Sequence, residues 1–141
     1  MLRLAAIGAA LVALAAAPAP AAVADALAAP YLHIQVALAN DSTDGVAEAA
    51  RAIAAEAAAM GEQAEAIGAA AEALAEATDL WSARDAFGPL SDALIAYGRE
   101  IGFGELRLAY CPMVDKEWLQ ATAELRNPFY GSMMLTCGEF R

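Results

Sequence analysis

Four stretches of the chain place their apolar residues at the three- and four-residue steps of an amphipathic helix. These stretches are residues 27–38, 46–60, 67–74 and 87–101, and most charged side chains fall on the other faces. The apolar stripes are Leu27, Tyr31, Ile34 and Leu38; Val46, Ala50, Ile53, Ala57 and Met60; Ile67, Ala71 and Leu74; Phe87, Leu90, Leu94, Tyr97 and Ile101. Four such helices with short connections predict an all-α, antiparallel four-helix bundle.

Glycine, proline and capping residues predict where the helices begin and end. Pro30 suits the first turn of the first helix, and Gly61 is a plausible end for the second. "SARD" at 82–85 has the spacing of a capping box, which would start the fourth helix just after it. Within that pattern, Gly88-Pro89 either kinks the helix or begins a new one.

The amphipathic-helix pattern ends at Gly102. From about residue 102 onward we expect a small irregular or mixed C-terminal lobe. Residues 105–108 alternate in polarity, which predicts a short strand that runs into Cys111. "RNPFYG" at 126–131 predicts a turn that brings the last segment back. If 132–138 is extended, one of its faces carries Met133, Leu135 and Cys137.

Residues 1–24 have the pattern of a cleaved signal peptide. Arg3 precedes an apolar stretch over 4–17, and prolines separate that stretch from a small-x-small end at 22–24. The alternative is a retained membrane anchor, but the apolar stretch is shorter than the roughly 18 to 20 residues that a spanning helix needs. We therefore expect a single helical-bundle domain at 25–141. It would be periplasmic or secreted, with no membrane contact after cleavage.

Composition and charge narrow the classes of partner. Hydrophobic residues make up 60% of the chain and the mean hydropathy is +0.44, but much of this comes from alanine, a strong helix former. The formal net charge of the whole sequence is −10. Cleavage of the signal peptide would remove one basic residue, Arg3, so the mature chain would carry a charge of 7 − 18 = −11. So acidic a chain argues against nucleic acid as a partner, because phosphates require basic side chains. It argues equally against an anionic membrane surface.

Sulfur-bearing residues concentrate near the C-terminus. Cys111, Met113, Met133, Met134 and Cys137 supply thiols and thioethers, which are the ligands that Cu(I) or Ag(I) prefers. The alternative is a disulfide between Cys111 and Cys137, which export favours, with the methionines filling the core. It would close 137 − 111 − 1 = 25 intervening residues and contribute about 3.5 kcal/mol in the chain-entropy model. Both roles require the two cysteines to lie close together.

Other chemistries lack the residues that they need. His33 is the sole histidine and falls on the first helix, where we expect a surface or interhelix residue. Two cysteines and one distant histidine do not make a closed zinc site. The sequence has no C-x-x-C-H, no glycine-rich phosphate loop and no G-x-S-x-G. Because the carboxylates are spread along helix surfaces, we expect no enzyme.

Several motifs resemble those of a known family. The strongest are "YCPM" at 110–113, Trp118-Leu119 and "RNPFYGSMMLTCGE" at 126–139. They are similar to the end of a helical domain of unknown function found in exported bacterial proteins. Weaker matches are the "LANDS" turn at 38–42 and the R-x-x-F of Arg84 and Phe87.

The resemblance implies a role in metal handling. The same domain is appended to periplasmic adaptor (membrane-fusion) subunits of copper and silver efflux pumps. This chain differs from the family at Phe129, where tyrosine is more frequent, and in its short stretch between Met113 and Trp118. The resemblance implies an exported Cu(I)- or Ag(I)-binding protein with an envelope or efflux-pump protein as partner. The alternative is a disulfide-stapled interaction module without metal, and redox use of the cysteine pair is a third reading.

Overall fold

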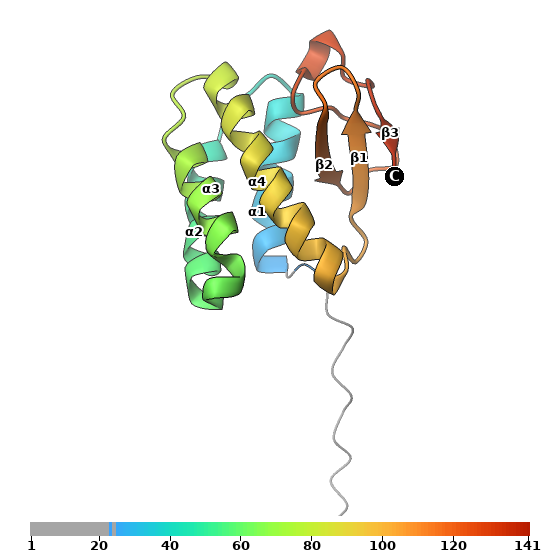
Figure 1. Cartoon of the computed structure of the whole chain (residues 1–141). Coiled ribbons are helices and arrows are strands. Elements are labelled where there is room, and N and C mark those ends of the chain that lie inside the picture. The colour runs from blue at the N-terminus through green and yellow to red at the C-terminus, as the bar shows by residue number, and fades with distance from the viewer. Residues whose placement is uncertain (1–22, 24) are drawn as a thin grey trace, which may run out of the picture.

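The computed structural model describes residue 23 and residues 25–141. The expected signal peptide at 1–24 lies outside the described residues, apart from Val23. In the described part, four α-helices are followed by a three-stranded sheet (Figure 1). The elements are α1 (Asp25–Ala39), α2 (Val46–Met60), η1 (Glu62–Ala64), α3 (Glu65–Ala75), α4 (Leu80–Ile101), β1 (Arg107–Cys111), β2 (Lys116–Gln120), η2 (Gly131–Met133) and β3 (Glu139–Phe140).

The predicted bounds hold for α2 but not for the start of α1. α2 begins at Val46, and Gly61 follows its last residue as predicted. α1 begins at Asp25, ahead of Pro30, so the predicted start at Pro30 is wrong. The extra turn carries Leu27, which is fully buried. This burial offsets the hydrogen bond that Pro30 removes from the helix.

α4 begins earlier than the predicted capping box at 82–85, which is therefore wrong. The box that forms instead pairs Asp79 with Ser82. The carboxylate of Asp79 accepts from the backbone N–H of Ser82 at 2.8 Å, and the hydroxyl of Ser82 accepts from the N–H of Asp79 at 3.1 Å. α4 then continues through Pro89 to Ile101, so no new helix begins at Pro89.

The expected all-α fold class is wrong, because the C-terminal part is a sheet and the chain is mixed α/β. β1 lies between β2 and β3 and is antiparallel to both. Its register with β2 runs from Arg107↔Gln120 to Cys111↔Lys116. The sheet is not a loose lobe: Trp118 of β2 is fully buried in the same core as the helices.

The elements form three layers, seen from left to right in Figure 1 as α2 with α3, then α1 with α4, then the sheet. β2 packs against both α4 and α1. An aromatic row crosses from the helices to the sheet. Tyr31 stacks on Phe87 with ring centroids 5.1 Å apart, Phe87 contacts Phe129 at 5.6 Å, and Phe129 meets Trp118 edge-on at 6.2 Å. Each ring buries a large apolar area, so the row joins the sheet firmly to the bundle.

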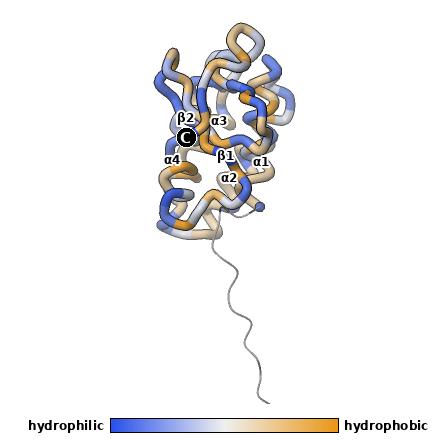
Figure 2. Tube along the Cα trace, turned by 90° about the vertical axis from the view of Figure 1, so that its right-hand side faces the viewer, coloured by the Kyte–Doolittle hydropathy of each residue, from blue (hydrophilic) through white to orange (hydrophobic). Residues whose placement is uncertain are grey.

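The hydropathy view shows that the helices are amphipathic, with apolar and polar residues alternating along the trace (Figure 2). In residues 25–141, none of the helices is both long and apolar enough to cross a membrane.

Tyr31 makes the buried polar link between α1, α4 and β2. Its hydroxyl lies 2.7 Å from the hydroxyl of Ser91 and accepts from the backbone N–H of Leu119 at 3.1 Å. Burial raises the pKa of Tyr31 well above its ordinary value, so the hydroxyl stays neutral.

Tyr31→Phe should therefore destabilise the fold without changing its shape. The change keeps the ring but leaves the buried N–H of Leu119 without an acceptor, at a cost of about 1–3 kcal/mol. Urea denaturation measures the loss, and Tyr97→Phe on the partly exposed side of α4 is the control. Equal stability of the Tyr31 variant and the wild type would contradict this role.

Candidate functional site

The two cysteines lie side by side at one end of the sheet. Cys111 is the last residue of β1, and Cys137 comes shortly before β3, which pairs with β1 at Tyr110↔Glu139. Their sulfur atoms are 3.1 Å apart, and both residues are free thiols. The predicted proximity of the pair is thus confirmed.

The loop between β1 and β2 wraps around the sulfur of Cys111. The backbone N–H groups of Val114 and Met113 lower the pKa of Cys111, and that of Met113 also acts to lower the pKa of Cys137. Asp115 closes the loop in the left-handed conformation, with φ of 51°, and its carboxylate accepts from the hydroxyl of Tyr110 at 2.8 Å. N–H groups that converge on a sulfur favour its thiolate form.

The two cysteines differ in pKa because their surroundings differ. Burial disfavours ionisation of Cys111, but hydrogen bonds from Cys137 and from the loop N–H groups outweigh it and lower the pKa of Cys111. The pKa of Cys137 is raised, first because its proton is held by Cys111 and then by burial and by the charge on Cys111. A cation that binds both sulfurs would displace their protons.

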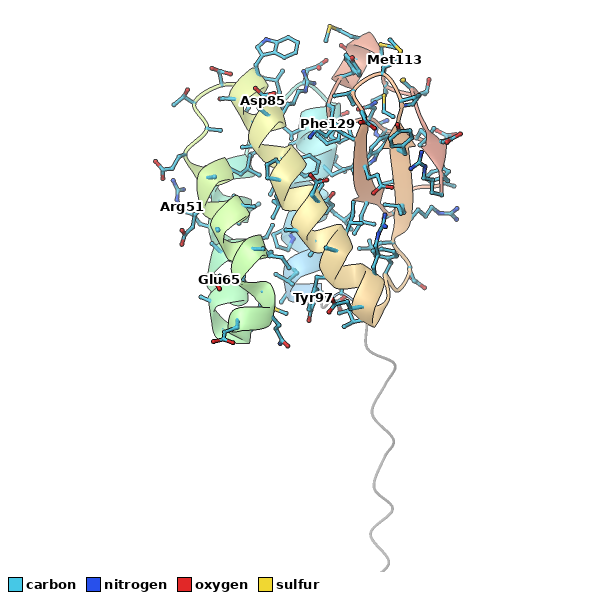
Figure 3. All side chains as sticks on the ribbon, in the orientation of Figure 1. Arg51, Glu65, Asp85, Tyr97, Met113 and Phe129 are labelled. Atoms are coloured by element: carbon cyan, nitrogen blue, oxygen red, sulfur yellow. The ribbon has the colours of Figure 1, made fainter. Side chains whose placement is uncertain are left out.

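The three methionines of the predicted site are at the surface. Met113 is 63% exposed, Met133 58% and Met134 36%. Figure 3 shows Met113 at the outer end of the sheet. Filling the core, the structural alternative for these methionines, is therefore wrong. Within the described chain, none of their thioethers is hydrogen-bonded to either thiol, so the structure brings together the cysteines but not the full sulfur set.

The segment that carries Met133 and Met134 is not extended. It forms the short helix η2 and a turn, because the N–H of Met134 donates to the carbonyl of Gly131 at 3.2 Å and the N–H of Cys137 donates to that of Met134 at 3.0 Å. The conditional expectation of one face shared by Met133, Leu135 and Cys137 therefore fails. Hydrogen bonds within the turn replace the pairing that a strand would need.

The sulfur separation lies between the values for a disulfide and for a bound ion. A disulfide requires about 2.05 Å. Two thiolates on one ion, at metal–sulfur distances of about 2.3 Å and tetrahedral or wider angles, stand about 3.7 Å or more apart. At 3.1 Å, a small side-chain rotation reaches either state. The donor set thus fits a soft cation and fits a disulfide.

Asn127 anchors the segment that carries Cys137, a role that the sequence did not reveal. Its fully buried side chain donates to the carbonyl of Cys137 at 3.0 Å and accepts from the N–H of Phe129 at 2.9 Å. Its own backbone N–H donates to the carbonyl of Leu135 at 2.7 Å. The turn predicted at 126–131 is confirmed, since the N–H of Gly131 donates to the carbonyl of Asn127 at 3.0 Å.

A buried arginine ties this turn to the helices. Arg84 on α4 is 4% exposed and donates to the carbonyls of Pro128 at 2.9 Å and of Leu38 at 2.8 Å. It also pairs with the carboxylate of Asp41 at 2.6 Å. The two weaker motif matches, "LANDS" and R-x-x-F, therefore meet the turn "RNPFYG" at one point, which we call the arginine junction (Arg84, Asp41, Leu38, Pro128 and Gly131). Its role is to position the loops, and the residue pattern around Arg84 does not predict its burial.

Two details show how tightly the arginine junction is packed. Hydrogen bonds from Ser132 and then from Arg84 hold the pKa of Asp41 below its usual value, so this carboxylate stays charged at neutral pH. Gly131 has φ of 57°, and a Cβ there would collide with Asp41 and Arg84. Only glycine permits this close approach in the left-handed conformation.

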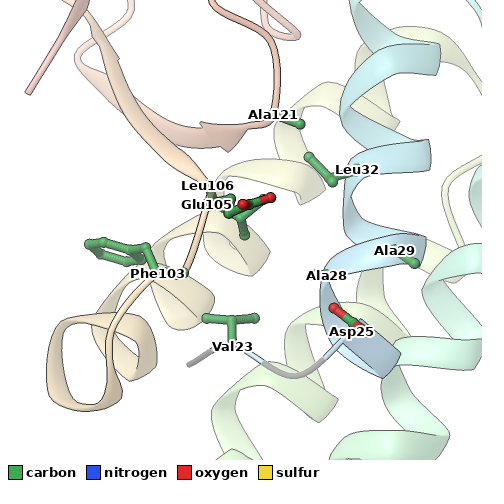
Figure 4. A pocket seen from close by; sticks show the side chains of 10 residues that line it. Val23, Asp25, Ala28, Ala29, Leu32, Phe103, Glu105, Leu106 and Ala121 are labelled. Atoms are coloured by element: carbon green, nitrogen blue, oxygen red, sulfur yellow. The ribbon is translucent and has the colours of Figure 1, made fainter. Parts of the chain in front are cut away.

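The rest of the described chain offers weaker candidates for a binding site. His33 is exposed and its Nε2 lies 3.0 Å from the carbonyl oxygen of Asp44, which fits the expected surface role. Among the described residues, no three histidine, cysteine, aspartate or glutamate side chains are grouped to hold a metal. A groove between α1 and the segment after α4 is lined by Leu32, Phe103 and Leu106 and contains none of the sulfur residues (Figure 4).

Comparison with known proteins identifies the helical part of the chain. Residues 27–105 match the family described as "Protein of unknown function (DUF3347)". The matched range covers nearly all of the four helices and ends before β1, so the sulfur-bearing segment lies beyond it. No curated protein and no solved structure matches the chain. Since the match extends over more than half of the sequence, the chain belongs to this family of proteins of unknown function.

Proposed function

We propose that this is an exported protein that binds one Cu(I) or Ag(I) ion and handles it for metal efflux. Cys111 and Cys137 supply two thiolates, and Met113 with either Met133 or Met134 completes a soft site of low coordination number. The observation that carries the proposal is the 3.1 Å contact between two thiols next to exposed methionines. Thioethers in the solvent do not stabilise a core, but they suit a soft cation.

The loop geometry supports a site for a charged ligand. The N–H groups that donate to both sulfurs stabilise negative charge there, which neutral thiols would not need. Asn127 and the arginine junction fix the segment that carries Cys137. Such support resembles the outer contacts that orient ligands in metal sites.

Export and a protein partner are part of the same proposal. The leader-like pattern of residues 1–24 supports a periplasmic or secreted location. The resemblance of 126–139 to domains on adaptor subunits of copper and silver pumps supports an envelope or efflux-pump partner. Trp81 is 61% exposed and lines one groove with Val114 of the β1–β2 loop, so an apolar contact surface adjoins the site.

Reduced wild-type protein is expected to take up one Cu(I) per chain from a chelator of moderate affinity under anaerobic conditions. Met113→Leu should weaken binding by about tenfold or more, because the substitution preserves size but removes a ligand. Met60→Leu on α2 is the matched control and should bind like the wild type. Absence of uptake by the reduced wild type, or equal weakening in both variants, would rule out the proposed site.

The alternative is a disulfide-stapled interaction module without metal. The same short sulfur contact supports it, because an oxidising compartment would close the bond. Alkylation of protein taken directly from the periplasmic fraction distinguishes the two functions. Two reactive thiols after removal of metal support the metal site, whereas a disulfide with no metal uptake after reduction supports the module.

A further inference from the structure

The two cysteines differ in how an outside reagent can reach them. Cys111 is fully buried at the end of the central strand, whereas Cys137 is partly exposed. β1 is paired on both sides, but β3 beside Cys137 is only two residues long. One sulfur is therefore shielded from solvent, and the other is accessible to a reagent.

The movement that bond formation at Cys137 needs is small. Gly138 follows it with φ of 141°, a conformation that L side chains rarely adopt. Cys137 is held by the bond from the Asn127 amide to its carbonyl and by its own N–H bond to Met134. Closing the sulfur contact from 3.1 Å to the length of a disulfide requires a shift of about one ångström.

We propose that Cys137 is a site of thiol–disulfide exchange with low-molecular-weight disulfides, and that Cys111 is the resolving thiol. In the first step Cys137, the sulfur that a reagent can reach, gives up its proton and attacks a small disulfide, forms a mixed disulfide and releases one small thiolate. In the second step the thiolate of Cys111 attacks the Cys137 sulfur, forms the Cys111–Cys137 bond and releases the second small thiolate. The protein loses two electrons and two protons, and the small disulfide is reduced to two thiols.

This chemistry would regulate the metal site. The oxidised pair has no thiolate left for an ion, and a bound ion occupies both sulfurs and blocks the first step. This regulation rests on the proposed function, whereas the exchange itself does not.

The test uses metal-free, reduced full chain and oxidised glutathione under anaerobic conditions, with intact mass as the readout. Wild type should lose two hydrogens with no lasting adduct. Cys111→Ser should retain one glutathionyl group, because the resolving thiol is missing. Cys137→Ser should react at least about tenfold more slowly, because Cys111 is reached only after local opening. Equal adduct formation in both variants, or no adduct on Cys111→Ser, would overturn the proposal.

A second measurement avoids dependence on the folding of the variants. Limiting iodoacetamide on folded wild type, followed by peptide mapping, should label Cys137 before Cys111, and urea should abolish the difference. Preferential labelling of Cys111 would overturn the assignment. Exchange without Cu(I) uptake would leave this inference standing and remove the proposed function, while Cu(I) uptake without exchange would do the reverse.

Discussion

Arg84→Ala is expected to lower the free energy of unfolding by about 3–5 kcal/mol. The change removes the donors for two buried carbonyls, those of Leu38 and Pro128, and leaves a cavity in place of a side chain that is 4% exposed. Urea denaturation followed by tryptophan fluorescence measures the loss. Because the aromatic row still joins the helices to the sheet in this variant, the two parts should still unfold together.

Two further variants show whether geometry or charge matters at this position. Arg84→Lys keeps the charge but cannot reach three acceptors at once, so it should lose a large part of the same stability. Arg51→Ala on the exposed face of α2 should change stability by less than about 0.5 kcal/mol. A loss below about 1 kcal/mol for Arg84→Ala would show that the arginine junction is not a structural anchor.

Cys111→Ser is expected to weaken Cu(I) binding by more than about 100-fold. Loss of outer contacts alone costs roughly 10- to 100-fold in metal sites, and here one of two thiolate ligands is removed. Competition against a chromogenic Cu(I) chelator, in reducing buffer, measures the affinity. Protons compete with the ion for sulfur, so wild-type affinity should also fall as the pH is lowered.

The disulfide alternative predicts a different result for the same variant. In oxidising buffer Cys111→Ser would lose about 2–5 kcal/mol of stability relative to wild type. In reducing buffer its Cu(I) affinity would match that of wild type. The two readings therefore differ in the Cu(I) affinity of Cys111→Ser in reducing buffer, and that measurement decides between them.

The helices could be predicted because their signal is local. α2 buries Val46, Ala50, Ile53 and Ala57 at the steps that the sequence shows, and alanine-rich segments have few competing conformations. β1 could also be expected, because its polarity alternates. The start of α4 was misplaced, since Asp79 and Ser82 form a better cap than the residues that follow.

The sheet and the arginine junction depend on contacts between distant residues. β2 buries Trp118, Leu119 and Gln120 in succession because helices cover one face and the C-terminal turns cover the other, so it shows no alternation. β3 has two residues, which is too short for an alternation of polar and apolar positions to show. Arg84 reads as a polar surface residue until Leu38 and Pro128 are placed beside it. The cysteine contact was predictable only because both of its proposed roles require it.

The aromatic row has a consequence for the order in which the chain can fold during synthesis. Phe87 lies on α4, but one of its two ring partners, Phe129, is near the end of the chain, and Trp118 beyond it comes late as well. While the ribosome still holds the last residues, the helices expose the apolar surface that these rings later cover. A chain released before Trp118 and Phe129 have been added would therefore be a target for chaperones and proteases.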